Sequence, residues 1–187
     1  MIYGVLIRKE KHIMRVLNNT VTLLLIIIAL NLSGCKVKYS FSGASISPEV
    51  KTCSVQYIQN RAPLAQSSLS QQLTDALKDK IQNQTRLVLV NGNSDVNFEG
   101  EISGYNTSPT NIRAQDKGAA AQNRLTISVR IKYTNSKDQQ LDFDKTFSRY
   151  EDFDARTSLT DAINNGILDD IITQIVQDIF NEAFVNW

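Results

Sequence analysis

Two pairs of carboxylates stand at alternate positions in the second half of the chain, where Glu99 is followed by Glu101 and Asp142 by Asp144. Side chains two residues apart on a strand project from the same face, so each pair has the arrangement needed for general acid–base catalysis or metal binding. We favour a plainer interpretation, a solvent-exposed sheet face, because no histidine or glycine-rich loop accompanies either pair.

The chain has a single histidine, His12, which limits the catalytic and metal sites that it can form. If the residues before position 35 are removed, no histidine remains, which excludes a Ser-His-Asp triad, Cys-His catalysis and most zinc sites. The sequence also contains no P-loop, Gly-x-Ser-x-Gly, HExxH, CxxC or dinucleotide-binding fingerprint. We therefore expect no catalytic residues, no metal and no cofactor.

Cys35 has the clearest chemistry, because it ends the run Leu32-Ser33-Gly34-Cys35 behind a short apolar stretch. Residues 21–32 are almost entirely apolar, but spanning a bilayer takes ~20 residues, so the stretch predicts a secretory signal peptide. The four residues resemble a bacterial lipobox. That resemblance implies that the Cys35 thiol takes a diacylglycerol, that the chain is cut before it, and that Cys35 becomes an acylated N-terminus.

Three parts of the chain follow from this motif. We expect residues 1–34 to be a signal peptide that is removed, with Met14 favoured over Met1 as the translation start. Residues 35–49 form the lipidated N-terminus and a tether, and residues 50–187 form a single domain. Lys36 is not the Asp that retains some lipoproteins at the inner membrane, which by resemblance favours the outer membrane.

Charge argues against a nucleic-acid partner. The whole chain has a net charge of +1, but the residues after position 34 carry 16 basic and 18 acidic side chains, a net of −2. Nucleic-acid-binding domains show a basic excess instead.

The second cysteine, Cys53, has no partner for an internal disulfide after cleavage, and we expect it to be a small buried hydrophobe.

Alternation of apolar and polar residues predicts five strands, at residues 51–58, 86–90, 96–106, 122–135 and 141–153. The last three are expected to form an antiparallel meander. In the first strand Tyr57 should share a buried face with Cys53 and Val55. Gly100 and Gly104 interrupt the third strand, which suggests a bulge or a close backbone approach.

Apolar residues at helical spacing predict two amphipathic helices, over residues 68–84 and from 159 to the C-terminus. Ser68 with Gln71 forms a capping-box pattern, Ser158 can cap the second helix, and residues 164–166 can bend it. The elements predict an α+β fold, a two-layer α/β sandwich. Its two helices pack on one face of a mixed, mainly antiparallel sheet of four to five strands, and the other face stays polar.

These segments together resemble the LptE family of lipopolysaccharide-assembly lipoproteins, in its Bacteroidetes-type branch. The resemblance covers the chain from Cys35 to Trp187 in segment order, and it rests on "GCKVKYSFSGASISPEVKTCSVQYIQNRAP", "LSQQLTDALKDKIQNQTRLVLV", "FEGEISGY", "NRLTISVRIKYTN", "KTFSRYEDFD" and "FNEAFVNW". It implies a non-catalytic lipoprotein, anchored in the outer membrane through lipid. Its domain would lie on the periplasmic side or in the lumen of an LptD-type β-barrel, where it would act as a plug and help to deliver lipopolysaccharide.

The family is known to bind lipopolysaccharide through basic residues, and cations suit the phosphates of lipid A. The candidates chosen by chemistry are Arg113, Lys117, Arg124, Arg130 and Lys132. Two alternatives stay open. One is a generic outer-membrane or surface lipoprotein that binds glycan or protein without a barrel partner. The other is an enzyme that uses one of the carboxylate pairs, which would need a concave pocket and a raised carboxylate pKa.

Overall fold

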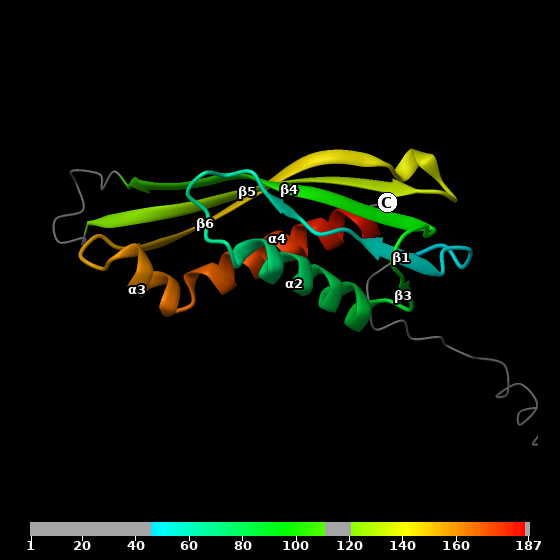
Figure 1. Cartoon of the computed structure of the whole chain (residues 1–187), viewed down its shortest axis with the longest axis horizontal. Helices are drawn as coiled ribbons and strands as arrows, with labels where there is room; N and C mark the ends of the chain where they lie inside the picture. The colour runs from blue at the N-terminus through cyan, green and yellow to red at the C-terminus, as the bar shows by residue number, and fades with distance from the viewer. Residues whose placement is uncertain (1–45, 111–120, 186–187) are drawn as a thin grey trace, which may run out of the picture. The chain divides into compact units, whose positions relative to one another are not determined.

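The computed structural model describes residues 46–110 and 121–185, which form one sheet with helices on one of its faces (Figure 1). The strands are β1 (Thr52–Val55), β2 (Gln59–Asn60), β3 (Val88–Leu89), β4 (Val96–Pro109), β5 (Gln122–Asn135) and β6 (Phe143–Asp154). The helices are α2 (Leu69–Gln84), α3 (Leu159–Asn164), α4 (Ile167–Phe184) and the short 3₁₀ helix η1 (Gln139–Leu141). The predicted α+β sandwich is confirmed.

The sheet is mixed, with the order β3-β1-β4-β5-β6, and β2 also pairs with β4. β4, β5 and β6 form the antiparallel meander that the alternation predicted. β1 pairs in parallel with both β3 and β4, and β2 pairs in parallel with β4. β2 adds a sixth strand where a loop was expected, because two residues are too few to show a period of two.

The second predicted helix is divided rather than bent. α3 ends at Asn164, and α4 begins after Gly166, whose φ of 98° is left-handed and suits glycine. The weak helix formers at residues 164–166 therefore break the helix completely. This break lets α4 run on beneath β5 and β6 and beside α2.

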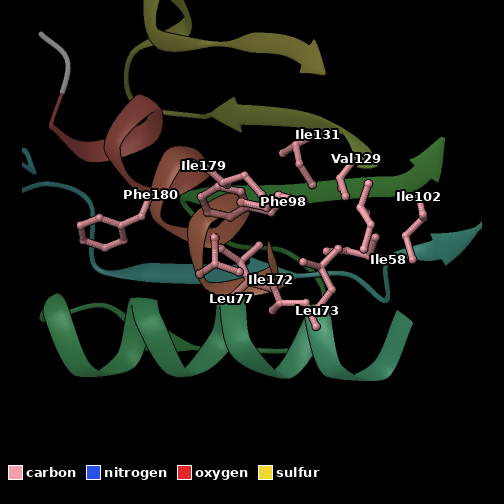
Figure 2. Close-up of a cluster of buried hydrophobic side chains, with 14 of the residues drawn as sticks. Ile58, Leu73, Leu77, Phe98, Ile102, Val129, Ile131, Ile172, Ile179 and Phe180 are labelled. Atoms are coloured by element: carbon pink, nitrogen blue, oxygen red, sulfur yellow. The ribbon is translucent and has the colours of Figure 1, made fainter. Parts of the chain in front are cut away.

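The hydrophobic core lies between the helices and the sheet, where α2 and α4 turn their apolar stripes toward each other and toward the strands (Figure 2). α2 contributes Leu73 and Leu77, α4 contributes Ile175 and Ile179, and all four are fully buried. Every inward residue predicted for β5 is buried: Leu125, Ile127, Val129, Ile131 and Tyr133. Fully burying one such side chain stabilises a fold by roughly 1.5–3 kcal/mol, so this layer holds the domain together.

Both glycines of β4 have the role predicted for them. A Cβ at Gly100 would lie 2.5 Å from Ile131 Cδ1 and 3.0 Å from the Arg130 carbonyl oxygen of the neighbouring strand, so a side chain here would displace Ile131 and crowd the β5 backbone. The register between β4 and β5 shifts between Ile102 and Gly104, which is an irregularity of the bulge type. Because of this shift Tyr105 is buried in the core.

The structure corrects the prediction for Tyr57. β1 ends at Val55, Tyr57 is 53% exposed, and Ile58 is buried in its place. The Ile58 N–H donates to Thr74 Oγ1 of α2 at 3.1 Å, which fixes this turn of the chain to the helix layer. Alternation fails here because the chain changes direction between β1 and β2.

At the edge of the sheet, β6 turns charged side chains toward α4. Arg149 forms a bidentate ion pair with Asp178, at 2.5 and 2.7 Å, and Lys145 pairs with Glu182. Glu151 accepts a hydrogen bond from Gln174. On the inner side of β6 these polar contacts therefore alternate with Phe143, Phe147 and Phe153, which pack on the core.

The two predicted helix caps differ in the structure. The Ser158 hydroxyl accepts the Asp161 N–H at 3.1 Å and donates to the Asp161 carboxylate, as expected, whereas Ser68 makes no side-chain cap hydrogen bond. We expect Ser158→Ala to lower the free energy of unfolding by about 1 kcal/mol. Ser68→Ala is the matched control and should change it little. Urea titrations followed by circular dichroism measure both, and equal losses would contradict the assignment.

Candidate functional site

The sheet face turned away from the helices, here called the outer face, is covered by none of the described residues. Polar side chains from the three long strands occupy it, as the alternation predicted. On β5 they are Arg124, Thr126, Ser128, Arg130, Lys132 and Thr134, flanked by Asn97, Glu99 and Glu101 of β4 and by Asp144, Thr146, Ser148, Tyr150 and Asp152 of β6. This face also carries three of the candidate cations, Arg124, Arg130 and Lys132.

A charged groove of about 360 Å³ opens in the outer face and contains two of the candidate cations. Its lining residues are Gln56, Tyr57, Gln59, Glu99, Gly100, Glu101, Arg130, Lys132 and Asp144. The Arg130 guanidinium donates two hydrogen bonds to Asp144, both 2.8 Å long. These bonds lower the pKa of Asp144 and raise that of Arg130, so the two charges largely neutralise each other.

The other charges of the groove are also engaged, with one exception. Glu99 accepts hydrogen bonds from Gln56 and Asn97, and Glu101 lies 3.7 Å from Arg61. Lys132 forms no hydrogen bond or ion pair with any residue that the structure describes, although its charge contributes to lowering the pKa of Asp144. Lys132 is thus the candidate cation most available to an anionic ligand.

Arg124 lies on the same face but away from the groove, six residues from Arg130 along β5, which is about 20 Å. Its guanidinium forms a bidentate pair with Asp152, at 2.7 and 2.9 Å, and lies 3.6 Å from the centre of the Tyr150 ring. The structure therefore brings Arg130 and Lys132 together and leaves Arg124 apart. Arg113, Lys117 and the predicted lipidation site Cys35 lie outside the described residues.

A second depression, here called the polar cleft, adjoins the charged groove and shares Gln56 with it. Its volume is about 700 Å³, and it is lined by Ser54, Gln56, Gly92, Asn93, Ser94, Asp95, Asn97, Thr134, Asn135, Ser136, Gln139 and Asp142. No cation lines it, and most of the lining groups are amides and hydroxyls. No sequence pattern indicated this cleft, because its residues come from four separate segments of the chain.

Asp95 fixes one end of the polar cleft. Its Oδ2 accepts hydrogen bonds from the Lys51 N–H at 2.9 Å, the Thr52 N–H at 3.0 Å and the Thr52 hydroxyl at 2.9 Å. Lys137 Nζ lies 3.2 Å from its other oxygen. The two backbone hydrogen bonds, followed by those from the Thr52 and Lys137 side chains, hold the pKa of Asp95 well below its usual range. This carboxylate joins the starts of β1 and β4 to the turn after β5.

The contacts of Asp142 and Asp144 do not favour general acid–base catalysis by that pair. Asp144 has a lowered pKa, whereas a general acid near neutral pH needs a raised one. Asp142 Oδ1 accepts the Asn135 N–H at 2.7 Å. Across residues 46–110 and 121–185, no group of three or more His, Cys, Asp or Glu side chains is placed to hold a metal ion. Cys53 is fully buried, as predicted, and burial raises the pKa of its thiol to about 12.

Three solved structures are similar to this chain, and the first of them shares its fold. A hypothetical protein of Chlamydia trachomatis matches 73% of this chain and 99% of its own length, with 8% identity and a TM-score of 0.50. Rare lipoprotein B of Shewanella oneidensis matches 68% and 91%, with 13% identity and a TM-score of 0.43. An uncharacterised lipoprotein B of Nitrosomonas europaea matches 70% and 80%, with 17% identity and a TM-score of 0.41. No curated protein sequence matches the chain.

The chain is thus an α+β domain whose uncovered sheet face is polar and carries ion pairs between neighbouring strands. The model of the LptE family, described as lipopolysaccharide-assembly, matches residues 50–183. The chain belongs to this family, which is a non-catalytic family of assembly lipoproteins. Membership supports a role in lipopolysaccharide assembly in the bacterial envelope.

The Asp95 contacts predict how stability depends on pH. Because the pKa of Asp95 is lower in the fold than its unfolded value of ~3.9, the ionised carboxylate stabilises the fold above that value. This contribution is lost as the pH falls toward the folded pKa. We expect Asp95→Asn to lower the urea midpoint at pH 7 and to lose less further stability between pH 6 and pH 3 than the wild type.

Asp79→Asn, at an exposed position of α2, is the matched control for that measurement. Its urea midpoint should follow the wild type at every pH. A parallel shift of the Asp95→Asn midpoint across the whole pH range would show that the carboxylate charge has no such role.

Proposed function

We propose that this protein is a non-catalytic lipoprotein subunit of the outer-membrane lipopolysaccharide translocon, which plugs an LptD-type β-barrel and assists delivery of lipopolysaccharide to the outer leaflet. The observation that carries the proposal is the family match over residues 50–183, joined to an uncovered polar sheet face. The lumen of an outer-membrane barrel is itself polar. A plug that fills such a lumen needs a polar outer surface and a core of its own.

The outer face meets that need. Its central part carries small hydroxyl side chains, with Ser128 and Ser148 hydrogen-bonded to each other at 2.9 Å between facing strands. Around them, Arg124 and Arg130 are paired with carboxylates of β6. Where the outer face carries short polar groups and paired charges, it can pack against a hydrated protein wall without burying an unpaired charge.

Binding of lipopolysaccharide itself is proposed for the basic candidates. Those in the described residues differ in how free they are to contact a phosphate. Lys132 is exposed and makes no ion pair with the described residues, so it can meet a phosphate at no cost to an existing contact. Arg130 and Arg124 would have to leave Asp144 and Asp152 first, or bind while still paired with them. The slight acidic excess of the chain after the lipidation site agrees with a contact that is local rather than a broad basic surface.

The barrel partnership is tested by purifying the full-length lipidated protein from outer membranes in mild detergent and identifying what accompanies it by mass spectrometry. We expect a barrel of the LptD kind at equal stoichiometry. Ser148→Arg, in the middle of the outer face, should reduce its recovery at least tenfold, because a long cation is forced into the interface. Thr173→Arg, exposed on α4, is the control and should retain the barrel.

Recovery of the lipoprotein alone, under conditions that preserve other outer-membrane complexes, would contradict the translocon role. It would favour the alternative of a generic envelope lipoprotein that binds glycan or protein. Loss of the barrel with Thr173→Arg but not with Ser148→Arg would place the contact on the helix layer instead.

The anchor at Cys35 is tested separately by metabolic labelling with palmitate. Cys35→Ser removes the thiol that would carry the diacylglycerol, so labelling should disappear and the protein should leave the membrane fraction. Cys53→Ala is the matched control, because Cys53 is fully buried in the domain, and it should keep the label. Persistent labelling of Cys35→Ser would overturn the assignment of the lipidation site.

A further inference from the structure

We propose that the polar cleft, together with Tyr57 of the adjoining charged groove, is a binding site for the uncharged sugar rings of an oligosaccharide. The inference goes beyond the proposed function, since it names a ligand chemistry and a location that do not depend on a barrel partner. It is distinct from phosphate recognition by the basic candidates, because none of the cleft-lining residues is a cation.

The first argument is the inventory of hydrogen-bonding groups that the fold leaves unused. The side chains of Ser54, Thr134 and Gln139 make no hydrogen bond to the described residues, although all three line the cleft. Ser54 is only 4% exposed, yet its hydroxyl is not among the enclosed polar atoms that lack a partner, so it reaches the cleft surface. Such groups both donate and accept, as sugar hydroxyls do, and a ligand that pairs with them takes the place of water in the open cleft.

Amide and carboxylate oxygens extend this set. Gln56 and Asn97 donate through their amide nitrogens to Glu99 Oε1, which orients both amides and leaves their carbonyl oxygens as acceptors. Asp142 uses Oδ1 for the Asn135 N–H, and its second oxygen remains available at the cleft. A fixed acceptor array beside free hydroxyls suits the many hydroxyl donors of a saccharide.

The cleft is also held in place by contacts that do not involve a ligand. Asp95 ties its one wall to Lys51 and Thr52, and Asn135 Oδ1 accepts the N–H groups of Lys137 and Asp138 in the turn after β5. A site whose walls are already fixed loses little conformational freedom on binding. The volume of about 700 Å³ lies within the ~300–1,000 Å³ typical of small-molecule sites.

Tyr57 supplies the apolar surface that such a ligand needs. It is 53% exposed and lines the charged groove next to Gln56, the residue that the groove and the cleft share. Sugar rings have an apolar face of C–H groups, which pack on an aromatic ring while the hydroxyls at the ring edge bind polar groups. The large exposed aromatic that broke the predicted burial pattern of β1 has a purpose in this arrangement.

A phosphate ligand fits the cleft less well. Asp142 places negative charge at its wall, and the charge of Asp95 is offset by Lys137 at 3.2 Å. The candidate cations belong to the adjoining groove, where Arg130 is already paired with Asp144. An anion bound in the cleft would be repelled by Asp142, whereas a neutral polyol would not.

The experiment is saturation-transfer NMR on the full-length lipidated protein, kept in a detergent without a sugar head group. The probe is the oligosaccharide fraction released by mild acid from the envelope of the bacterium that makes the protein, and treated with phosphatase. We expect transfer to the sugar ring protons. Thr134→Val removes one hydroxyl and keeps the β-branched shape of a strand residue, so it should weaken binding about three- to tenfold. Tyr57→Leu should weaken it as well.

Thr126→Val is the matched control, on the same strand and the same face but outside the cleft, and it should bind like the wild type. Circular dichroism confirms that each variant is folded. The proposal is overturned if no component of the fraction receives transfer, if only material that retains phosphate does, or if Thr134→Val and Tyr57→Leu bind as tightly as Thr126→Val. These outcomes leave the barrel partnership untouched, since that is judged by co-purification.

Discussion

The pairing of β4 with β5 is the constraint on which the rest of the structure depends. Both strands are 14 residues long, and they stay in contact along almost their entire length. One face of this ladder supplies Phe98 and the apolar row of β5 to the core, where the two long helices close over it (Figure 2). The other face must then present every second residue to the outside, and the outer face is the direct consequence.

Those parts of the fold that follow from local periodicity could be predicted from the sequence, such as the inward row of β5 and the apolar stripe of α2. Tyr57 was mispredicted because β1 is only four residues long, and the chain turns toward β2 before the alternation can continue. The polar cleft could not be predicted from the sequence, for a different reason. Ser54, Thr134 and Gln139 become neighbours only through the parallel pairing of β1 with β4 and the turn before β6.

The sequence predicted that the basic candidates of β5 lie on one strand face. It did not predict which carboxylates they pair with. Arg124 stands opposite Asp152 because of the β5–β6 register, and that register is set by the turn at residues 136–142. A shift of one residue would have placed these cations against other partners. A count of basic residues therefore overstates the positive charge that this surface offers to a ligand.

The charged side chains on the inner side of β6 affect how readily another molecule can pair with this edge of the sheet. β6 ends the sheet, and a free strand edge readily accepts a strand from another molecule. Lys145 and Arg149 face inward beneath that edge and are held by Glu182 and Asp178 of α4. These charges alternate with Phe143 and Phe147, so a strand added at this edge would have to accommodate ion pairs between apolar contacts. Inward-pointing charges of this kind disfavour edge-to-edge pairing with another chain.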